Sequence, residues 1–168
     1  VAGGGEYPVV FAQEAARNGC AVHAVALEGR ADPRLEKICA SVKYFKLGQL
    51  SAPITALRDA GVEKAVMAGL VKHASVFSVF SMDLRAAALL ARLPDFRAES
   101  ILGAIVGEFA KDGIEIVSSA TFLERLLPQP GVLGRCKPNK QQEKSIEFGI
   151  KIAKKLAEAD IGLTTVVC

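Results

Sequence analysis

Residues 18–27 are NGCAVHAVAL, a glycine that can end a helix followed at once by a run of apolar residues. The same pairing recurs in residues 60–68 (AGVEKAVMA) and 112–118 (DGIEIVS). Glycine in the left-handed conformation is common just past a helix C-terminus. Strands that are apolar on both faces are typical of parallel sheets covered by helices. The three stretches therefore predict that helices and buried parallel strands alternate.

Outward from these stretches, the chain alternates between two periods. The expected strands are residues 21–27, 42–46, 64–68 and 114–118. Apolar residues recur at helical spacing in two of the other segments, at Val9, Ala12 and Ala16, and at Ile101, Ile105 and Phe109. This alternation predicts an α/β fold, with a Rossmann-like parallel sheet and helices on both faces.

The alternation of helix and strand patterns stops at residues 127–131 (LPQPG), because this proline-containing stretch can neither continue a helix nor form a central strand. Residues 141–158 then have the spacing of one long helix, and residues 164–168 that of a strand. We therefore predict a first domain at residues 1–127. Residues 128–168 are expected to hold a linker and the first helix and strand of a second α/β domain. Because the chain opens on a glycine turn and closes on a strand, we expect a strand before Val1 and further sequence after Cys168.

Composition excludes several classes of protein. The chain has 168 residues, 51% of them hydrophobic, and this is enough to build a core. Its net charge of +3 is too small to predict a nucleic-acid partner. No apolar run approaches the roughly 20 residues of a membrane span. The four cysteines are far apart and the start does not resemble a secretory signal, which favours a cytoplasmic location.

The glycine turn near the start is the first candidate ligand site. Gly3, Gly4 and Gly5 lead into a helix that has Pro8 in its first turn. Glycines allow a ligand to approach the backbone closely, and free N–H groups at a helix start favour phosphate. Only Gly3 and Gly5 match the dinucleotide fingerprint, because Pro8 stands where its third glycine should be. A tight turn that only packs the helix against the sheet is an equally good interpretation.

Glu28, just past the strand expected at residues 21–27, keeps a second function open. A carboxylate about 20 residues beyond a glycine turn is where an NAD-binding protein holds the ribose. The chain could thus supply the nucleotide-binding domain of an NAD(P)-dependent oxidoreductase. Arg30 and Asp32 lie beside Glu28 and favour a solvated polar loop instead.

Gly69, Lys72 and His73 follow a strand that is apolar enough to be central. Lysine offers a point charge for phosphate, and histidine a group that titrates near neutral pH. His23 lies within a strand and is expected to be a hydrogen-bonded structural residue. The segment around Phe77 is either a core or interdomain contact or an apolar lip for a lipid-like ligand.

The long helix carries a basic face. Its members are Lys140, Lys144, Lys151 and Lys155. Such a face is usually solvated, but it could also hold the protein weakly at an anionic membrane surface. Asp160 and Gly162 end this helix and are expected to form a turn.

Taken in order, several short motifs resemble the LpxI-type UDP-2,3-diacylglucosamine pyrophosphatases of Gram-negative bacteria. They are Ala2-Gly3-Gly4-Gly5 with Pro8, Arg30-Ala31-Asp32-Pro33, Leu47-Gly48-Gln49, Met67-Ala68-Gly69, Asp83-Leu84-Arg85-Ala86, Pro130-Gly131-Val132-Leu133 and Asp160-Ile161-Gly162. No one of these motifs is specific, but the ordered set covers almost the whole chain.

The resemblance implies an enzyme that hydrolyses UDP-2,3-diacylglucosamine to 2,3-diacylglucosamine 1-phosphate (lipid X) and UMP in lipid A biosynthesis. This chain would supply mainly the lid domain over a catalytic domain. The implied metal is Mg²⁺ or Mn²⁺, with its ligands and the catalytic acids expected beyond Cys168.

The implied substrate contacts are Gly3, Gly4, Gly5, Gly69, Lys72, His73, Phe77, Asp160 and Gly162. The implied partner is a lipid-linked sugar nucleotide, with a peripheral position at the inner membrane and a homodimer left open. A sugar-nucleotide-binding module without catalysis is a further alternative.

Overall fold

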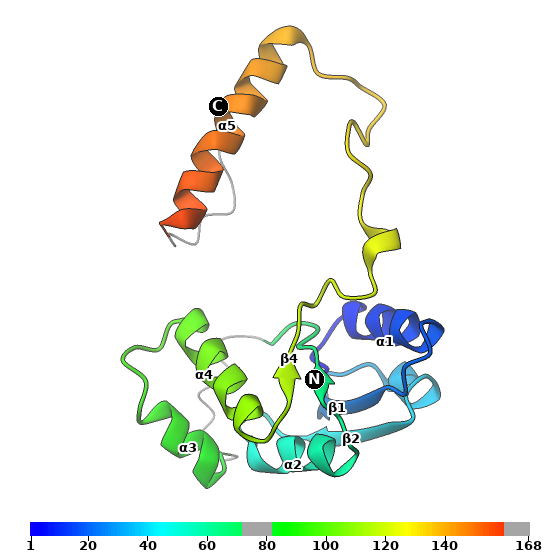
Figure 1. Ribbon diagram of the computed structural model, residues 1–168, viewed down its shortest axis with the longest axis vertical. Helices are drawn as coiled ribbons and strands as arrows, with labels where there is room; N and C mark the ends of the chain where they lie inside the picture. The colour runs from blue at the N-terminus through cyan, green and yellow to red at the C-terminus, as the bar shows by residue number, and fades with distance from the viewer. Residues whose placement is uncertain (72–81, 160–168) are drawn as a thin grey trace. The chain divides into compact units, whose positions relative to one another are not determined.

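The computed structural model describes residues 1–71 and 82–159 (Figure 1). Within these residues it is an α/β protein with five α-helices and short parallel strands in two small sheets. The chain divides into two compact units, Val1–Leu126 and Leu127–Cys168. The α/β prediction is confirmed at this level.

The four strands of the first unit form where the apolar stretches predict them, and all but β2 are shorter than predicted. β1 (His23–Leu27) pairs in parallel with β2 (Ser41–Phe45). β3 (Lys64–Ala65) pairs in parallel with β4 (Glu115–Ile116). The expected structural role of His23 is confirmed, because its Nδ1 lies 2.8 Å from Ser41 Oγ across the β1–β2 pair.

The segment around Ala2 joins the two sheets. Ala2 N–H donates to the carbonyl of Val25 in β1 at 2.8 Å, and Leu27 N–H donates back to Ala2 at 2.9 Å. On the other side, Ala2 pairs in parallel with Ala68, and Gly3 N–H donates to the carbonyl of Ala68 at 2.8 Å. The hydrogen-bonded order is therefore β2, β1, the Ala2 segment, β3 with its continuation to Ala68, and β4.

Three helices end as the glycine pattern predicts. They are α1 (Tyr7–Arg17), α2 (Ser51–Asp59) and α4 (Ala98–Lys111). The residue that follows each helix cap is a glycine at positive φ, 81° at Gly19, 74° at Gly61 and 78° at Gly113. Glycine carries no Cβ and adopts this conformation without strain.

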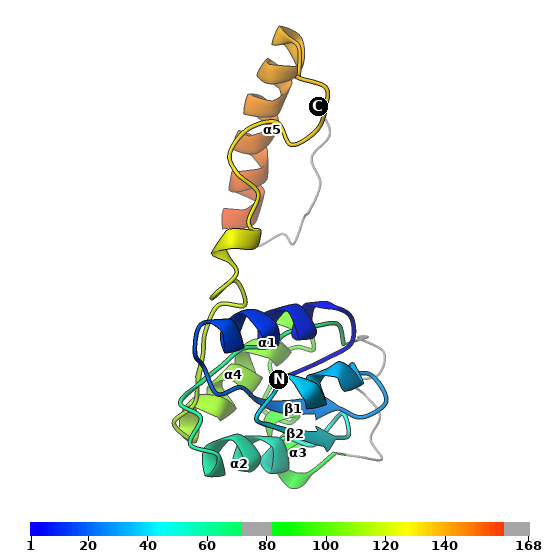
Figure 2. The same cartoon turned by 90° about the vertical axis from the view of Figure 1, so that its right-hand side faces the viewer.

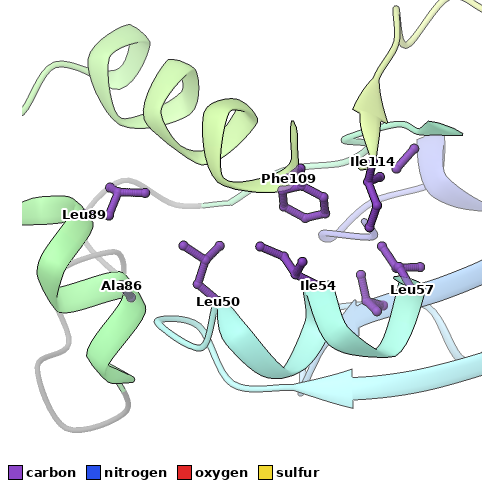
Figure 3. Packing of buried hydrophobic residues seen from close by; sticks show 9 residues of the cluster. Leu50, Ile54, Leu57, Ala86, Leu89, Phe109 and Ile114 are labelled. Carbon is purple, nitrogen blue, oxygen red and sulfur yellow. The ribbon is translucent and has the colours of Figure 1, made fainter. Parts of the chain in front are cut away.

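The first unit has two apolar clusters, because neighbouring residues of β1 point to opposite faces. Ala26 packs with Val9 and Ala12 of α1. Val25 packs in the other cluster, shown in Figure 3, whose other buried members are Leu50, Ile54, Leu57, Ala65, Ala86, Leu89, Phe109 and Ile114. Figure 2 shows α1 and α2 on opposite sides of β1 and β2.

The sequence pattern did not predict α3 (Leu84–Leu90) or the short 3-10 helices η1 (Pro33–Lys37) and η4 (Glu124–Leu126). α3 is a short, alanine-rich run with little periodicity, and tertiary contacts hold it in place. Arg85 ties it to α4, with Nε 2.6 Å from Glu108 Oε2 and Nη2 2.6 Å from Asp112 Oδ2.

The second unit contains α5 (Lys140–Glu158), which confirms the predicted long helix. Asn139 accepts hydrogen bonds from the N–H groups of Gln141 and Gln142, and the Gln142 side chain accepts from Asn139 N–H, forming a capping box. Residues 127–139 contain neither helix nor strand, as the proline pattern predicts. No helix in residues 1–71 and 82–159 is long and apolar enough to cross a membrane.

Candidate functional site

The carboxyl ends of the parallel segments meet at one edge of the first unit, where the glycine turn also lies. In an open parallel sheet, ligands collect at this edge. Gly3 N–H donates to Ala68 and Gly4 N–H donates to Leu70 at 3.0 Å, while Leu70 N–H donates back to Gly4 at 2.8 Å. The turn is thus bound to the segment that follows β3, and the first two glycines have no N–H left for a ligand.

Gly3 and Gly69 are glycines because the two segments approach so closely. A Cβ at Gly3 would lie 2.9 Å from the carbonyl oxygen of Leu70. A Cβ at Gly69 would lie 2.7 Å from the carbonyl oxygen of Gly4, and Gly69 also has a φ of 93°. The packing interpretation of the turn therefore accounts for these two residues.

The start of α1 keeps donors available beside the turn. Among the described residues, no group accepts a hydrogen bond from the N–H of Gly5, Glu6 or Tyr7. Pro8 follows in the first turn of the helix, and Gly5 has a φ of 94° with open space around it. Three N–H groups at a helix start form a site suited to phosphate or carboxylate.

An acidic pair beside this helix start is neutralised in part by Arg34. Its Nη2 lies 2.6 Å from Glu6 Oε2 and 2.7 Å from Asp32 Oδ2. The Arg34 hydrogen bonds hold the pKa of Asp32 below its usual value, and those from Asp32 and Glu6 raise the pKa of Arg34. Arg34 is therefore occupied by carboxylates.

A pocket of about 600 Å³ opens at the same edge. Its walls come from the ends of β1 and β2, the segment after β3, the start of α2, and helices α3 and α4. The apolar side chains on these walls include Leu27, Phe45, Met67, Leu70, Leu89, Ile101, Leu102, Ile105 and Phe109. Of the described lining residues, Lys46 and Gln49 alone have polar side chains.

The remaining predicted contacts lie outside the described residues. They are Lys72, His73, Phe77, Asp160 and Gly162. Glu28 directly follows β1, is exposed, and is not part of the pocket wall. No cluster of three or more His, Cys, Asp or Glu side chains in the described parts of the chain could hold a metal ion. Cys20, Cys39 and Cys136 are free thiols.

Comparison with known proteins agrees with the ordered motifs. Residues 1–126 match the LpxI N-terminal domain, and residues 129–168 match the LpxI C-terminal domain. The chain belongs to the LpxI family. It is also 28% identical over 174 residues to UDP-2,3-diacylglucosamine pyrophosphatase LpxI of Caulobacter vibrioides. That alignment covers 100% of this chain and 60% of the relative, so the chain spans three-fifths of the relative's length.

Two motifs that suggested the LpxI family have structural roles here. Gly48 has a φ of 100°, and a Cβ there would lie 3.1 Å from Met82 Cγ. Asp83 accepts hydrogen bonds from Ala86 N–H with one oxygen and from Leu50 and Ser51 N–H with the other. These residues fix the loop and the helix starts around the pocket.

Lys46 and Gln49 were missed as site residues in this LpxI-family chain. Lys46 directly follows β2, and its N–H donates to Gln49 Oε1 at 2.9 Å. The rule that singled out Gly69, proximity to the carboxyl end of a strand, also applies to these two residues. Applied to the strand predicted at residues 42–46, it would have found both.

Proposed function

We propose that this chain forms the substrate-covering part of a hydrolase in lipid A biosynthesis. The reaction is the hydrolysis of UDP-2,3-diacylglucosamine to 2,3-diacylglucosamine 1-phosphate (lipid X) and UMP. The observation that carries the proposal is the match to both LpxI domains, which together account for residues 1–126 and 129–168. The name of the Caulobacter relative, UDP-2,3-diacylglucosamine pyrophosphatase, supports the same reaction.

For the first unit we propose a Rossmann-like lid. If the five parallel segments are numbered along the chain, their order across the sheet is 3-2-1-4-5. This is the order of a doubly wound dinucleotide-binding sheet up to its fifth strand. The order reverses between the Ala2 segment and β3, and the glycine turn lies at that point. A ligand site is expected there.

The phosphates of the sugar nucleotide fit best at the start of α1. Gly5 N–H and the next two N–H groups are the donors, while Gly3 and Gly4 bring the turn against the segment that follows β3. The helix dipole contributes only about 0.3–1 kcal/mol to such binding. Further contacts are therefore needed, and Gly69, Lys72, His73, Phe77, Asp160 and Gly162 stay predicted contacts.

A divalent metal, Mg²⁺ or Mn²⁺, is part of the proposal through the family alone. The described residues do not fit a metal ion, since no suitable cluster of His, Cys, Asp or Glu is present among them. We place the metal ligands and catalytic acids outside these residues. No step of the reaction is assigned to the side chains of the first unit.

A peripheral position at the inner-membrane surface also stays a proposal. The lysine face of α5 supports it, because each basic residue near an anionic surface contributes about 1 kcal/mol. Binding would be weak and would fall as salt is added. Sedimentation of the full-length protein with anionic vesicles at low and high salt tests this, and equal sedimentation in both would contradict it. The homodimer stays a prediction that light scattering can test.

The reaction is tested with the full-length protein and UDP-2,3-diacylglucosamine. We expect UMP and lipid X to appear in equal amounts, to stop on chelation, and to resume when Mg²⁺ or Mn²⁺ is restored. A folded, metal-supplied protein that leaves the substrate intact would contradict hydrolysis. Binding of lipid X without turnover would favour the alternative of a non-catalytic module. The oxidoreductase alternative predicts a change in NADH fluorescence on addition of protein.

A further inference from the structure

The apolar pocket of about 600 Å³ is larger than the voids of a packed interior. Interior voids seldom exceed the size of a water molecule. Pockets of about 300–1,000 Å³ are typical of small-molecule sites. This pocket borders the core cluster, and Figure 3 shows Leu89 of α3, Phe109 of α4 and Leu50, which directly precedes α2, pointing toward one another. The size and position indicate a site for a ligand.

Exposed apolar side chains surround the opening. Leu70 is 68% exposed and Leu102 is 48% exposed, and both line the pocket. Val71, also on the lining, is 38% exposed. Covering such side chains with another apolar group is favourable, because it removes apolar surface from water. A nucleotide would leave its base and ribose hydrogen bonds unpaired here, whereas a hydrocarbon chain would not.

The polar groups of the opening favour one sign of charge. Lys46 is exposed at the end of β2, and none of the described carboxylates lies within ion-pair distance of it. The described lining contains no Asp or Glu. An anionic group at the mouth therefore meets one cation and no like charge from the pocket wall.

We propose that this pocket binds one hydrocarbon chain of an anionic amphiphile, with Lys46 as the countercharge at its mouth. The identity of the chain as an acyl group of UDP-2,3-diacylglucosamine or lipid X rests on the proposed function. In that case the pocket lies beside the turn that would hold the phosphates, since Gly3 and Gly69 also line it. Lys46 is then a binding residue, and Ile101, Leu102, Ile105 and Phe109 form the α4 wall of the acyl site.

Chain length gives the first test. Octyl, decyl and dodecyl phosphate are titrated into the full-length protein below their micelle concentrations. Affinity is expected to rise by up to about fourfold per added methylene, the equivalent of about 0.8 kcal/mol. Inorganic phosphate should bind far more weakly than dodecyl phosphate. Equal affinity for all three alkyl phosphates would overturn the proposal.

Two variants of α4 test the location. Ile105→Trp fills the pocket, and Leu102→Glu places a carboxylate on its wall at a position that tolerates exposure. Each is expected to weaken dodecyl phosphate binding by about tenfold or more, because a blocked or charged wall removes the apolar contact. Val106→Trp, on the same helix but outside the lining, should bind as the parent does. Parent-like binding by folded Leu102→Glu would place the chain elsewhere.

Lys46→Glu tests the countercharge. We expect it to weaken dodecyl phosphate by about two- to fivefold, the range of an exposed ion pair, and not to weaken dodecyltrimethylammonium. Lys43→Glu makes the same charge change on β2 outside the lining and should change neither affinity. An equal loss for both probes in Lys46→Glu would remove Lys46 from the site.

The pocket and the reaction can fail separately. A protein that binds dodecyl phosphate as described but does not cleave UDP-2,3-diacylglucosamine keeps the pocket and loses the proposed function. A protein that cleaves this substrate with the same KM in Leu102→Glu and the parent keeps the function and loses the pocket.

Discussion

Gly69 shows how a single residue shapes the carboxyl edge of the sheet. Its φ of 93° and the approach of Gly4 and Pro8 leave no room for a side chain, because an added Cβ would lie 2.7 and 2.8 Å from their atoms. The glycine lets the segment after β3 lie directly against the turn that begins α1. Both borders of the proposed phosphate site depend on this contact.

Gly69→Ala is therefore expected to lower the free energy of unfolding by about 1–3 kcal/mol, the cost of strained backbone. Urea denaturation of the full-length protein measures the change. Gly107→Ala is a matched control, because Gly107 lies within α4 with nothing near its Cβ position. The control should gain about 0.5–1 kcal/mol from helix propensity. Equal stability of Gly69→Ala and the parent would show that the contact is not tight.

At the scale of residues, the sequence predicted the positions at which glycine is needed better than the contacts that require it. For the run Gly3 to Gly5, ligand approach and simple packing were equally good interpretations of the sequence, and the structure shows that Gly3 is required by Leu70, which is distant in the chain. A local pattern cannot show a contact between distant segments. The left-handed glycines after α1, α2 and α4 were predicted well, because a helix end is a local event.

Among the elements, α2 and α3 are joined at their starts by one carboxylate. Asp83 accepts from Ala86 N–H at 2.8 Å in α3 and from Leu50 and Ser51 N–H at 2.7 Å in α2. Burial acts to raise the pKa of Asp83, but these backbone hydrogen bonds outweigh it and hold the pKa below its ordinary value of 3.8. One side chain thus caps two helices that border the pocket.

Asp83→Ala is expected to lower the free energy of unfolding by about 1–3 kcal/mol at neutral pH, since two helix starts lose their acceptor. A depressed folded pKa gives stability that is present above pH 3.8 and lost as pH falls through the folded value. The difference between variant and parent should therefore shrink below pH 4. Urea titrations at pH 6 and pH 3 measure it. Asp59→Ala, at the exposed end of α2, should cost much less, and equal losses would contradict the double cap.

The sequence predicted elements according to their periodicity. α1, α4 and α5 have clear helical spacing and were expected, whereas α3 is short and owes its position to Asp83 and Arg85. The strand expected at residues 42–46 has its predicted length as β2, one residue earlier in the chain, whereas β1, β3 and β4 are shorter than the apolar runs that predicted them. Regular pairing with a neighbouring strand spans only part of each of these three runs. The strand expected at residues 164–168 lies outside the described residues.

For the molecule as a whole, family membership and the geometry of the sheet edge both agree with the proposed substrate class. The LpxI match and the Caulobacter relative support the proposal of a lipid-linked sugar nucleotide, and the edge has N–H groups that donate to none of the described residues, beside an apolar pocket. The sequence could predict the α/β class and the break in the helix and strand pattern near residue 128. The pocket could not, because its walls come from segments scattered between residues 1 and 109.

Hydrogen exchange of the full-length protein, with and without lipid X, examines whether this edge is the binding site. We expect slower exchange at the N–H groups of Gly5, Glu6 and Tyr7, and at residues 66–71, when lipid X is bound. Residues 18–22, at the opposite ends of the strands, should exchange at the same rate in both states. Protection that leaves residues 5–7 and 66–71 unchanged while lipid X is demonstrably bound would contradict the proposed site.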